Sequence, residues 1–90
     1  DIILADINQT TLMIYSREGV YQTTETLTRF QQRISSSNFI QVSRHAVINI
    51  DHLESLSDSF SGNMTAKLTN QIKTEVSRRY VKLLMEYLGI

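Results

Sequence analysis

Two adjacent arginines near the C-terminus are the residues in this sequence best suited to bind an anion. Arg78 and Arg79 directly follow Ser77, and the apolar residues beyond them have helical spacing. If Ser77 is the N-cap of a helix, both arginines fall in its first turn, where free backbone N–H groups already carry partial positive charge. Each cation at this position destabilises the helix by about a few tenths of a kcal/mol unless an anion binds beside it. Together, the N–H groups and guanidinium forks suit a phosphate oxygen or a guanine edge. Two solvated arginines whose stems cover apolar neighbours fit the local chemistry equally well.

A second polar stretch, Ser43-Arg44-His45, separates two apolar segments that have the character of strands. A sheet that presents a short polar loop is a common way to position binding residues. Arginine is also the side chain whose fork matches O6 and N7 of guanine. Spacing alone favours the simpler interpretation, a solvated connection between strands.

The charge distribution is uneven although the net charge is zero. Residues 67–82 contain five bases and one acid, whereas residues 51–63 contain three acids and neither Lys nor Arg. A local cationic segment is enough to hold phosphate because charges are screened over about 8–10 Å at physiological salt. A solvated helix face gives the same count about as often. The candidate phosphate contacts are Lys67, Lys73, Arg78 and Lys82.

Length and composition limit the class of protein. Ninety residues are enough for one compact domain and too few for two. Cysteine is absent, which excludes disulfides and thiolate metal sites and is compatible with the cytoplasm. No apolar run is long enough to span a membrane, and no basic-then-apolar leader opens the chain. The chain begins at Asp1 without a methionine, and we interpret it as a fragment of a longer protein.

The N-terminal part of the chain has the pattern of an antiparallel β-meander. Apolar segments beginning at residues 2–4 and 12–15 flank a polar turn at 8–10, and the turn at 16–19 leads to a β-branched and aromatic run. A helix is then predicted, because Leu27, Phe30 and Ile34 share one helical face after Thr26, a suitable N-cap. The polar residues Ser35, Ser36, Ser37 and Asn38 end it in a loop.

The remaining residues predict four more strands and a second helix. The strands are expected at 39–42, 46–50, 64–69 and 72–76, with a loop at 57–63 and a tight Asn70-Gln71 turn. The second helix follows Ser77 and ends at Gly89, a natural terminating residue. Its apolar face consists of Val81, Leu84, Met85 and Leu88. The pattern predicts a mostly β domain with two short helices.

Two stretches resemble motifs of the LytTR family of bacterial DNA-binding domains. Residues 39–53, F-I-Q-V-S-R-H-A-V-I-N-I-D-H-L, resemble that family's hallmark F-I-R-V-H-R-S-Y-I-V-N-L-D-H-I. Residues 76–80, V-S-R-R-Y, resemble its closing motif at the right spacing, and residues 4–19 resemble its opening hairpin. The resemblance covers nearly the whole chain, and the two motifs together are specific.

This resemblance implies both a fold and a function. The fold is an elongated β-β-β sandwich of small antiparallel sheets, here over residues 1–90 as the DNA-binding domain of a longer cytoplasmic response regulator of a two-component system. The function is sequence-specific binding of double-stranded promoter DNA for transcriptional regulation, through loops that enter successive major grooves. We expect no catalysis, cofactor, metal, membrane or small-molecule substrate. The isolated domain is expected to be a monomer, with paired occupancy of DNA supplied by the full-length protein.

The resemblance also assigns roles to residues by position. Arg44 and Arg79 are expected to read bases, together with Gln9 and Thr10 of the first loop. Contacts to the DNA backbone, or support for these loops, are expected from Asn8, Thr11, Ser43, His45, Lys67, Lys73, Ser77, Arg78 and Lys82. Asn49 matches a family asparagine that is expected to tie the strand end.

The chain departs from the family pattern in two loops. Ser43 stands where the family usually has histidine, and His45 follows two positions later. The first loop lacks the aromatic residue often found there. These departures predict a different target sequence, not a different function.

An enzyme or a metal site is the less favoured interpretation. Serine, histidine and aspartate occur, but there is no G-x-S-x-G motif and no cysteine. The spacing of His45, Asp51 and His52 matches no closed metal site. We expect His52 to lie at the surface or at a strand edge.

A protein-interaction or dimerisation module is the alternative from another class of function. The face formed by Leu84, Met85 and Leu88 is apolar enough for a partner helix, with Tyr80 and Tyr87 as anchors. We expect that face to pack on the sheet instead, because so small a domain needs the surface for its own core. The dependence on salt distinguishes the two functions, because salt weakens DNA binding through counterion release and does not weaken apolar association.

Overall fold

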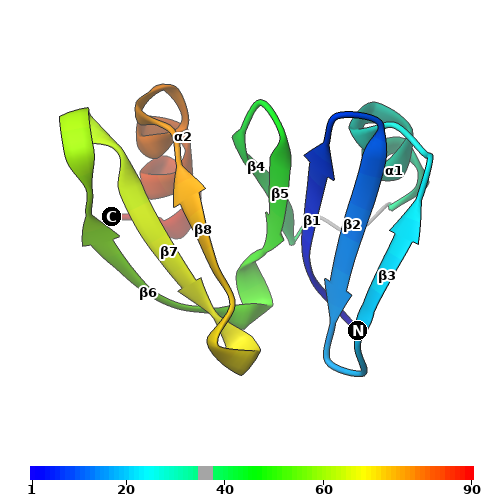
Figure 1. Ribbon diagram of the computed structural model, residues 1–90. Helices are drawn as coiled ribbons and strands as arrows, with labels where there is room; N and C mark the ends of the chain where they lie inside the picture. Colours follow the sequence, from blue (N-terminus) through cyan, green and yellow to red (C-terminus); the bar gives the residue numbers. More distant parts are fainter. Residues whose placement is uncertain (35–37) are drawn as a thin grey trace.

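The computed structural model describes residues 1–34 and 38–90, whose strands form two antiparallel sheets (Figure 1). The five-stranded sheet has the order β3-β2-β1-β5-β4, and the three-stranded sheet has the order β6-β7-β8. The first sheet contains β1 (Ile2–Asn8), β2 (Thr11–Ser16), β3 (Val20–Thr23), β4 (Phe39–Ser43) and β5 (Ala46–Asn49). The second contains β6 (Leu53–Asp58), β7 (Met64–Leu68) and β8 (Lys73–Val76). The prediction of a mostly β domain of small antiparallel sheets is confirmed.

Two helices and three short 3-10 turns complete the fold of the described residues. The helices are α1 (Leu27–Arg33) and α2 (Arg78–Leu88), and the turns are η1 (Ile50–His52), η2 (Phe60–Gly62) and η3 (Thr69–Gln71). Thr26 caps α1 as predicted, because its Oγ1 accepts a hydrogen bond from the Arg29 N–H at 3.1 Å. Gly89 ends α2 in the left-handed conformation, also as predicted (φ 78°). The predicted loop at Ser35, Ser36 and Ser37 lies outside the described residues.

The five-stranded sheet is covered on both faces, which explains the continuous apolar run in β5. Side chains alternate along a strand, so neighbours on β5 enter different cores. Val47 belongs to the core under α1, with Leu27 and Phe30. Ala46 and Ile48 belong to the larger core, which the three-stranded sheet and α2 close from the other side. All four residues of β5 are buried.

Helix α2 packs its apolar face on the protein's own core, as expected. Leu84 is fully buried, and Val81 and Leu88 pack against the same cluster. The helix contacts β4, the edge strand of the five-stranded sheet that lies closest to it. This packing covers one of that sheet's two edges. Among the described residues, no helix is long and apolar enough to cross a membrane.

The structure corrects the predicted environment of His52. The residue is buried, with only 8% of its surface exposed, where a position at the surface or at a strand edge was expected. The 3-10 turn after β5 directs the ring inward, where Nδ1 lies 2.9 Å from Thr69 Oγ1 and Nε2 lies 2.8 Å from Asp1 Oδ2. Asn49 attaches the end of β5 to the start of β1, as expected, because its Nδ2 donates to the Ile2 carbonyl at 2.8 Å.

The observed strand boundaries differ from the predicted ones by one or two residues. β4 includes Ser43. β6 was not among the predicted strands, and it includes Ser57 and Asp58, which were assigned to a loop. The connection from β6 to β7 is therefore only residues 59–63. The Asn70-Gln71 turn is confirmed, with positive φ at both residues (62° and 61°).

Candidate nucleic-acid interface

Four connecting segments lie along one edge of the molecule, the upper edge in Figure 1. They are the Gln9-Thr10 turn, the Arg44-His45 turn, the 59–63 loop and the first turn of α2. We call this set the loop edge. Strand register places them together, since Asp6 pairs with Ala46 in one sheet, and Asp58, Met64 and Val76 form a row at the end of the other.

Backbone hydrogen bonds connect these segments to one another. The Ile7 N–H donates to the His45 carbonyl at 2.8 Å, which fixes the second turn beside the first hairpin. The Ser77 N–H donates to the Val42 carbonyl at 2.9 Å, which fixes the start of α2 beside the end of β4. The loop edge is therefore a connected surface that spans both sheets.

The Arg44-His45 turn presents its arginine while its neighbours hold the backbone. Ser43 is buried, and its Oγ accepts from the His45 N–H at 3.2 Å, so it supports the turn and does not face solvent. His45 Nδ1 lies 2.7 Å from Asp6 Oδ1, a contact that fixes the orientation of the ring. Arg44 is exposed at the tip.

The N-terminus of α2 is capped by a residue that the sequence pattern did not indicate. Ser77 occupies the cap position in an extended conformation, but its side chain makes no capping hydrogen bond. Asn63 takes that role, because its Oδ1 accepts from the Arg78 N–H at 2.8 Å. The predicted position of Ser77 as the N-cap is therefore confirmed, whereas the capping oxygen comes from Asn63. A cap contributed by the 59–63 loop ties that loop to the helix.

Arg78 is also packed against this loop through its aliphatic stem. Gly62 has φ +85°, and a Cβ there would lie 2.9 Å from Arg78 Cδ. Glycine is therefore favoured at this position by its backbone conformation, and an added Cβ would also displace the Arg78 stem. Arg78 remains exposed despite this contact.

Arg44, Arg78, Arg79 and Lys82 form the cationic part of the loop edge and of the helix behind it. All four are exposed, and within residues 1–34 and 38–90 none of their side chains forms an ion pair. Arg79 lies in the first turn of α2, and Lys82 follows one turn later on the Arg78 side of the helix. Unpaired cations at a helix N-terminus leave room for an anion.

The first hairpin contributes polar groups without charge. Asn8, Gln9 and Thr10 are exposed at its tip, and half-buried Thr11 pairs with Asn8 in the strand register. Gln9 has φ 59°, which permits the two-residue connection. Amide and hydroxyl groups of this kind bond either a base edge or a phosphate.

Two of the sequence-predicted phosphate contacts lie away from the loop edge. Lys67 and Lys73 pair with each other across β7 and β8, next to the Asn70-Gln71 turn. That turn closes the opposite end of the hairpin, the lower end in Figure 1. Both side chains point to the exposed face of the small sheet, since their strand neighbours Ala66, Leu68 and Thr74 face inward.

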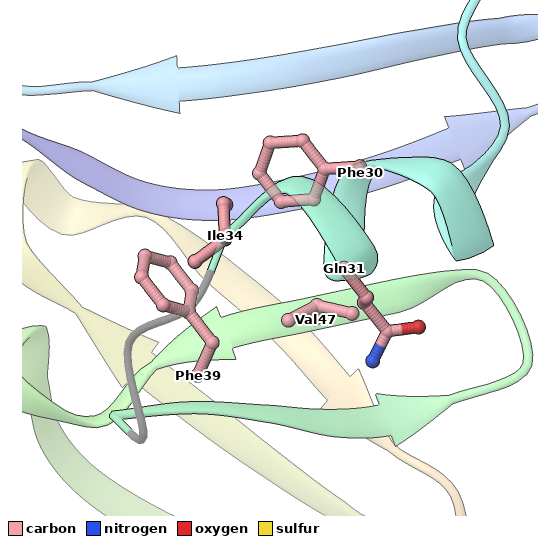
Figure 2. Close-up of a pocket in the computed structure, with 5 residues that line it drawn as sticks. All are labelled: Phe30, Gln31, Ile34, Phe39 and Val47. Carbon is pink, nitrogen blue, oxygen red and sulfur yellow. The ribbon is translucent and has the colours of Figure 1, made fainter.

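A small hollow under α1 is separate from the loop edge. It has a volume of about 100 Å³ and is lined by Phe30, Gln31, Ile34, Phe39 and Val47 (Figure 2). The lining side chains are apolar except for Gln31, whose amide points outward in Figure 2. Such a lining offers no group for acid–base or nucleophilic chemistry.

The histidines do not converge with acids into a metal site. His45 is paired with Asp6, and His52 with Thr69 and Asp1, so each ring has its own local partners. Across residues 1–34 and 38–90, no group of three His, Cys, Asp or Glu side chains is arranged to hold a metal ion.

Sequence reasoning missed Asn63, Gly62 and Asp6 as supports of the loop edge. Asn63 caps a helix that begins 15 positions later, and Asp6 meets a histidine 39 positions away. Such contacts depend on strand pairing, so local patterns do not reveal them. The glycine inside a polar loop was the only signal of a close approach at that point.

Comparisons with known proteins agree with this architecture. The chain is 32% identical over 90 residues to the sensory transduction protein LytR of Staphylococcus epidermidis, covering all of this chain and 36% of the relative. It is also 32% identical over 90 residues to LytT of Enterococcus faecalis, covering 37% of that protein. A transcriptional regulatory protein LytR of Staphylococcus aureus is 30% identical over 77 residues, which is 86% of this chain and 31% of the relative. The chain thus spans about a third of the length of these curated relatives.

A solved structure and a family model complete the comparison. The fold matches a LytTr DNA-binding domain from Bacillus cereus with a TM-score of 0.88 at 16% identity, covering 99% of this chain and 82% of that one. A family model described as the LytTr DNA-binding domain matches residues 1–89. The chain belongs to the LytTr DNA-binding domain family.

Proposed function

We propose that this domain binds double-stranded promoter DNA in a sequence-specific manner and reads the major groove through the loop edge. The observation that carries the proposal is the position of Arg44 and Arg79. Both are exposed, neither has a carboxylate partner in the described chain, and both project from backbone that hydrogen bonds hold in place. Arginines presented in this way match the bidentate O6 and N7 acceptors of guanine.

The dimensions of the molecule suit two neighbouring groove segments on one side of a duplex. The molecule is 32 Å long in its longest dimension, which compares with about 34 Å for one turn of B-DNA. The loop edge carries its two base-reading candidates on different sheets, Arg44 on the five-stranded sheet and Arg79 beyond the three-stranded one. Each arginine is therefore assigned to its own base positions.

The relatives' names give the proposal its context. They are described as sensory transduction and transcriptional regulatory proteins, and this chain matches about a third of their length. We infer that residues 1–90 form a single DNA-binding domain of a longer regulator. The domain binds without catalysis, and promoter recognition is its contribution to that regulator.

The test is an unbiased selection of DNA sequences with the wild-type domain and with single variants. Arg79→Ala is expected to lose about 1–3 kcal/mol of preference at its base pair, and Arg44→Ala a similar amount at different positions. Arg17→Ala is the matched control, because Arg17 is an exposed arginine in the turn at the opposite edge. Selection of the same sequences by all four proteins would refute the proposed reading residues. Failure of the wild type to enrich any sequence would refute specific DNA binding.

Self-association is the second candidate, and one observation favours it. The outer side of α2 exposes Leu83 and Tyr87, which lie one turn apart, and Ile90 is exposed just beyond the end of the helix. The face first considered for this role, around Leu84, is instead part of the core. Sedimentation of the domain without DNA tests this candidate, and a monomer at high concentration would exclude it.

A further inference from the structure

Phe60 is the most exposed large apolar side chain among the described residues. It is 86% exposed and occupies the first position of η2, in the 59–63 loop. Single exposed apolar residues are common and need no explanation by themselves. Phe60 is unusual because it belongs to the 59–63 loop, which lies on the loop edge (Figure 1) and caps the N-terminus of α2 through Asn63.

The loop that carries Phe60 is held firmly in place. The Ser59 N–H donates to the Asn63 carbonyl and the Asn63 N–H to the Phe60 carbonyl, both at 2.9 Å. Asn63 Oδ1 then accepts from the Arg78 N–H, and the Arg78 stem packs against Gly62. The loop and the first turn of α2 therefore form one unit, so Phe60 is held at a fixed place relative to the arginines.

The chemistry of the loop complements that of its neighbours. Residues 59–63 are Ser-Phe-Ser-Gly-Asn and include no charged side chain. The loop therefore adds no ionic contact to phosphate, and its projecting group is a phenyl ring. The apolar feature that base edges present in the major groove is the C5-methyl group of thymine, which phenylalanine side chains contact in protein–DNA complexes.

We propose that Phe60 is a specificity-determining residue that contacts a thymine methyl group next to the bases read by Arg79. This inference rests on the proposed DNA-binding function and extends it to a residue that neither sequence motif includes. A wedge into the minor groove would be the other use of an exposed phenylalanine. The attachment of the loop to α2 favours the major groove, where Arg79 is placed by the same proposal.

The test combines a protein variant with a change to single DNA methyl groups. Affinities are measured by fluorescence anisotropy for the selected site and for copies in which each thymine in turn is replaced by deoxyuridine, which lacks the methyl group. One substitution should weaken wild-type binding about 3- to 5-fold, as expected for one methyl group lost from an apolar contact. Phe60→Ala should weaken binding to the thymine site by at least that factor and should not respond to the same substitution.

Two further variants keep the result interpretable. Ile90→Ala is the matched control, because Ile90 is 84% exposed and lies at the other end of α2. It should retain the wild-type response to deoxyuridine. Phe60→Leu keeps an apolar side chain and should retain part of that response. Thermal unfolding should be unchanged in all three variants, since these side chains contribute little to the core.

Each remaining outcome decides against the inference in a recognisable way. If Phe60→Ala keeps full affinity and the wild-type response to deoxyuridine while Arg79→Ala loses specificity, the DNA-binding proposal stands and the role of Phe60 is refuted. A loss that is equal for thymine and deoxyuridine sites refutes the methyl contact. A change in self-association without a change in DNA affinity assigns Phe60 to a protein partner. If Arg79→Ala and Arg44→Ala both behave as wild type, the proposed function itself has failed.

Discussion

At the scale of single residues, the loop edge depends on side chains that orient the proposed DNA-reading groups. His45 stands beside Arg44 and contacts Asp6 through Nδ1 at 2.7 Å, while Ser43 holds its backbone. An ionised carboxylate only accepts hydrogen bonds, so it directs the Nδ1–H of the ring toward itself and leaves Nε2 available outward. Asp6 is thus a positioning residue for His45, and its charge also opposes the approach of phosphate.

Replacing Asp6 should separate these two effects. Asp6→Asn removes the charge and keeps a hydrogen-bonding partner, so non-specific affinity should rise while base preference is retained. Asp6→Ala removes both, and base preference beside the Arg44 positions should relax because the imidazole is no longer held. Selection of bound sequences and titration with random duplex DNA measure the two quantities. Equal base preference in both variants would show that His45 does not contribute to recognition.

The sequence predicted the environments of some single residues correctly and those of others incorrectly. The position of Arg44 in an exposed turn and the role of Asn49 followed from the motif, and the Thr26 cap followed from helical spacing. The burial of His52 did not, because its partners lie 17 and 51 positions away. A local pattern carries information about a residue's immediate neighbours. It carries little about which distant strand will cover that residue.

At the scale of elements, α2 is fixed at its start by another loop. Asn63 supplies the capping oxygen for the Arg78 N–H, and Ser77 does not use its side chain for this purpose. We expect Asn63→Ala to reduce the free energy of unfolding by about 1 kcal/mol, the usual cost of a lost cap. Ser77→Ala, at the position that sequence rules favour, should change it much less. Urea unfolding of both variants measures the difference, and a larger loss for Ser77→Ala would contradict the assigned cap.

Asn63→Ala should affect DNA binding as well as stability. The same hydrogen bond joins the 59–63 loop to the arginines, so its loss frees both parts of the loop edge. Asn63→Asp retains a capping oxygen and adds a negative charge, which is favourable at a helix N-terminus. It should therefore preserve stability, whereas its charge should weaken the affinity for DNA.

Helix α1 is supported by an ion pair with a defined pH dependence. Arg33 donates from Nε to Glu25 Oε2 at 3.0 Å and from a terminal nitrogen to Glu25 Oε1 at 2.6 Å. The hydrogen bond from Arg33 lowers the pKa of the Glu25 carboxyl below its ordinary value. A lowered pKa in the folded state means that the pair stabilises the fold above the ordinary glutamate pKa and that this contribution is lost as pH falls through the lowered value.

The prediction for this pair is a shift in titration. Arg33→Gln should raise the pKa of Glu25 toward its ordinary value, as followed by NMR of the carboxyl group. Arg29→Gln is the matched control, because Arg29 acts on Glu25 only through a weaker Coulombic contribution, and it should move the pKa less. An equal shift in the two variants would show that the hydrogen bond is not the main cause.

The order of strands was the part of the fold that the sequence pattern left open. Alternation and turn residues predicted most strands to within two residues, since period and turn chemistry are local properties. The placement of β1 between β2 and β5 was not predictable in this way. It depends on which apolar faces cover each other, and several orders bury similar surface. The family resemblance supplied the sandwich architecture that the pattern alone did not.

At the scale of the whole molecule, the location of positive charge on one edge is more relevant to the proposed DNA binding than the net charge. The chain is neutral overall. Arg44, Arg78, Arg79 and Lys82 nevertheless lie at or next to the loop edge without ion-pair partners in the described residues. Lys67 and Lys73 lie at the other end of the small sheet. A duplex bound at the loop edge would therefore contact only part of the cationic segment, residues 67–82, although these residues are continuous in the sequence.

This separation leads to a prediction for the dependence of DNA affinity on salt. Four phosphate contacts from Lys67, Lys73, Arg78 and Lys82 would give a slope of log K against log salt of about −3 to −4, at about 0.9 counterions per contact. With only Arg78 and Lys82 in reach, we expect a slope of about −2. Lys82→Gln should reduce its magnitude by about 0.9, and Lys73→Gln, the matched control, should leave it unchanged. Titration of a labelled half-site duplex at several salt concentrations measures all three slopes. Equal effects of the two substitutions would mean that DNA also follows the face of the small sheet, and a slope near zero for the wild type would argue against phosphate binding by this edge.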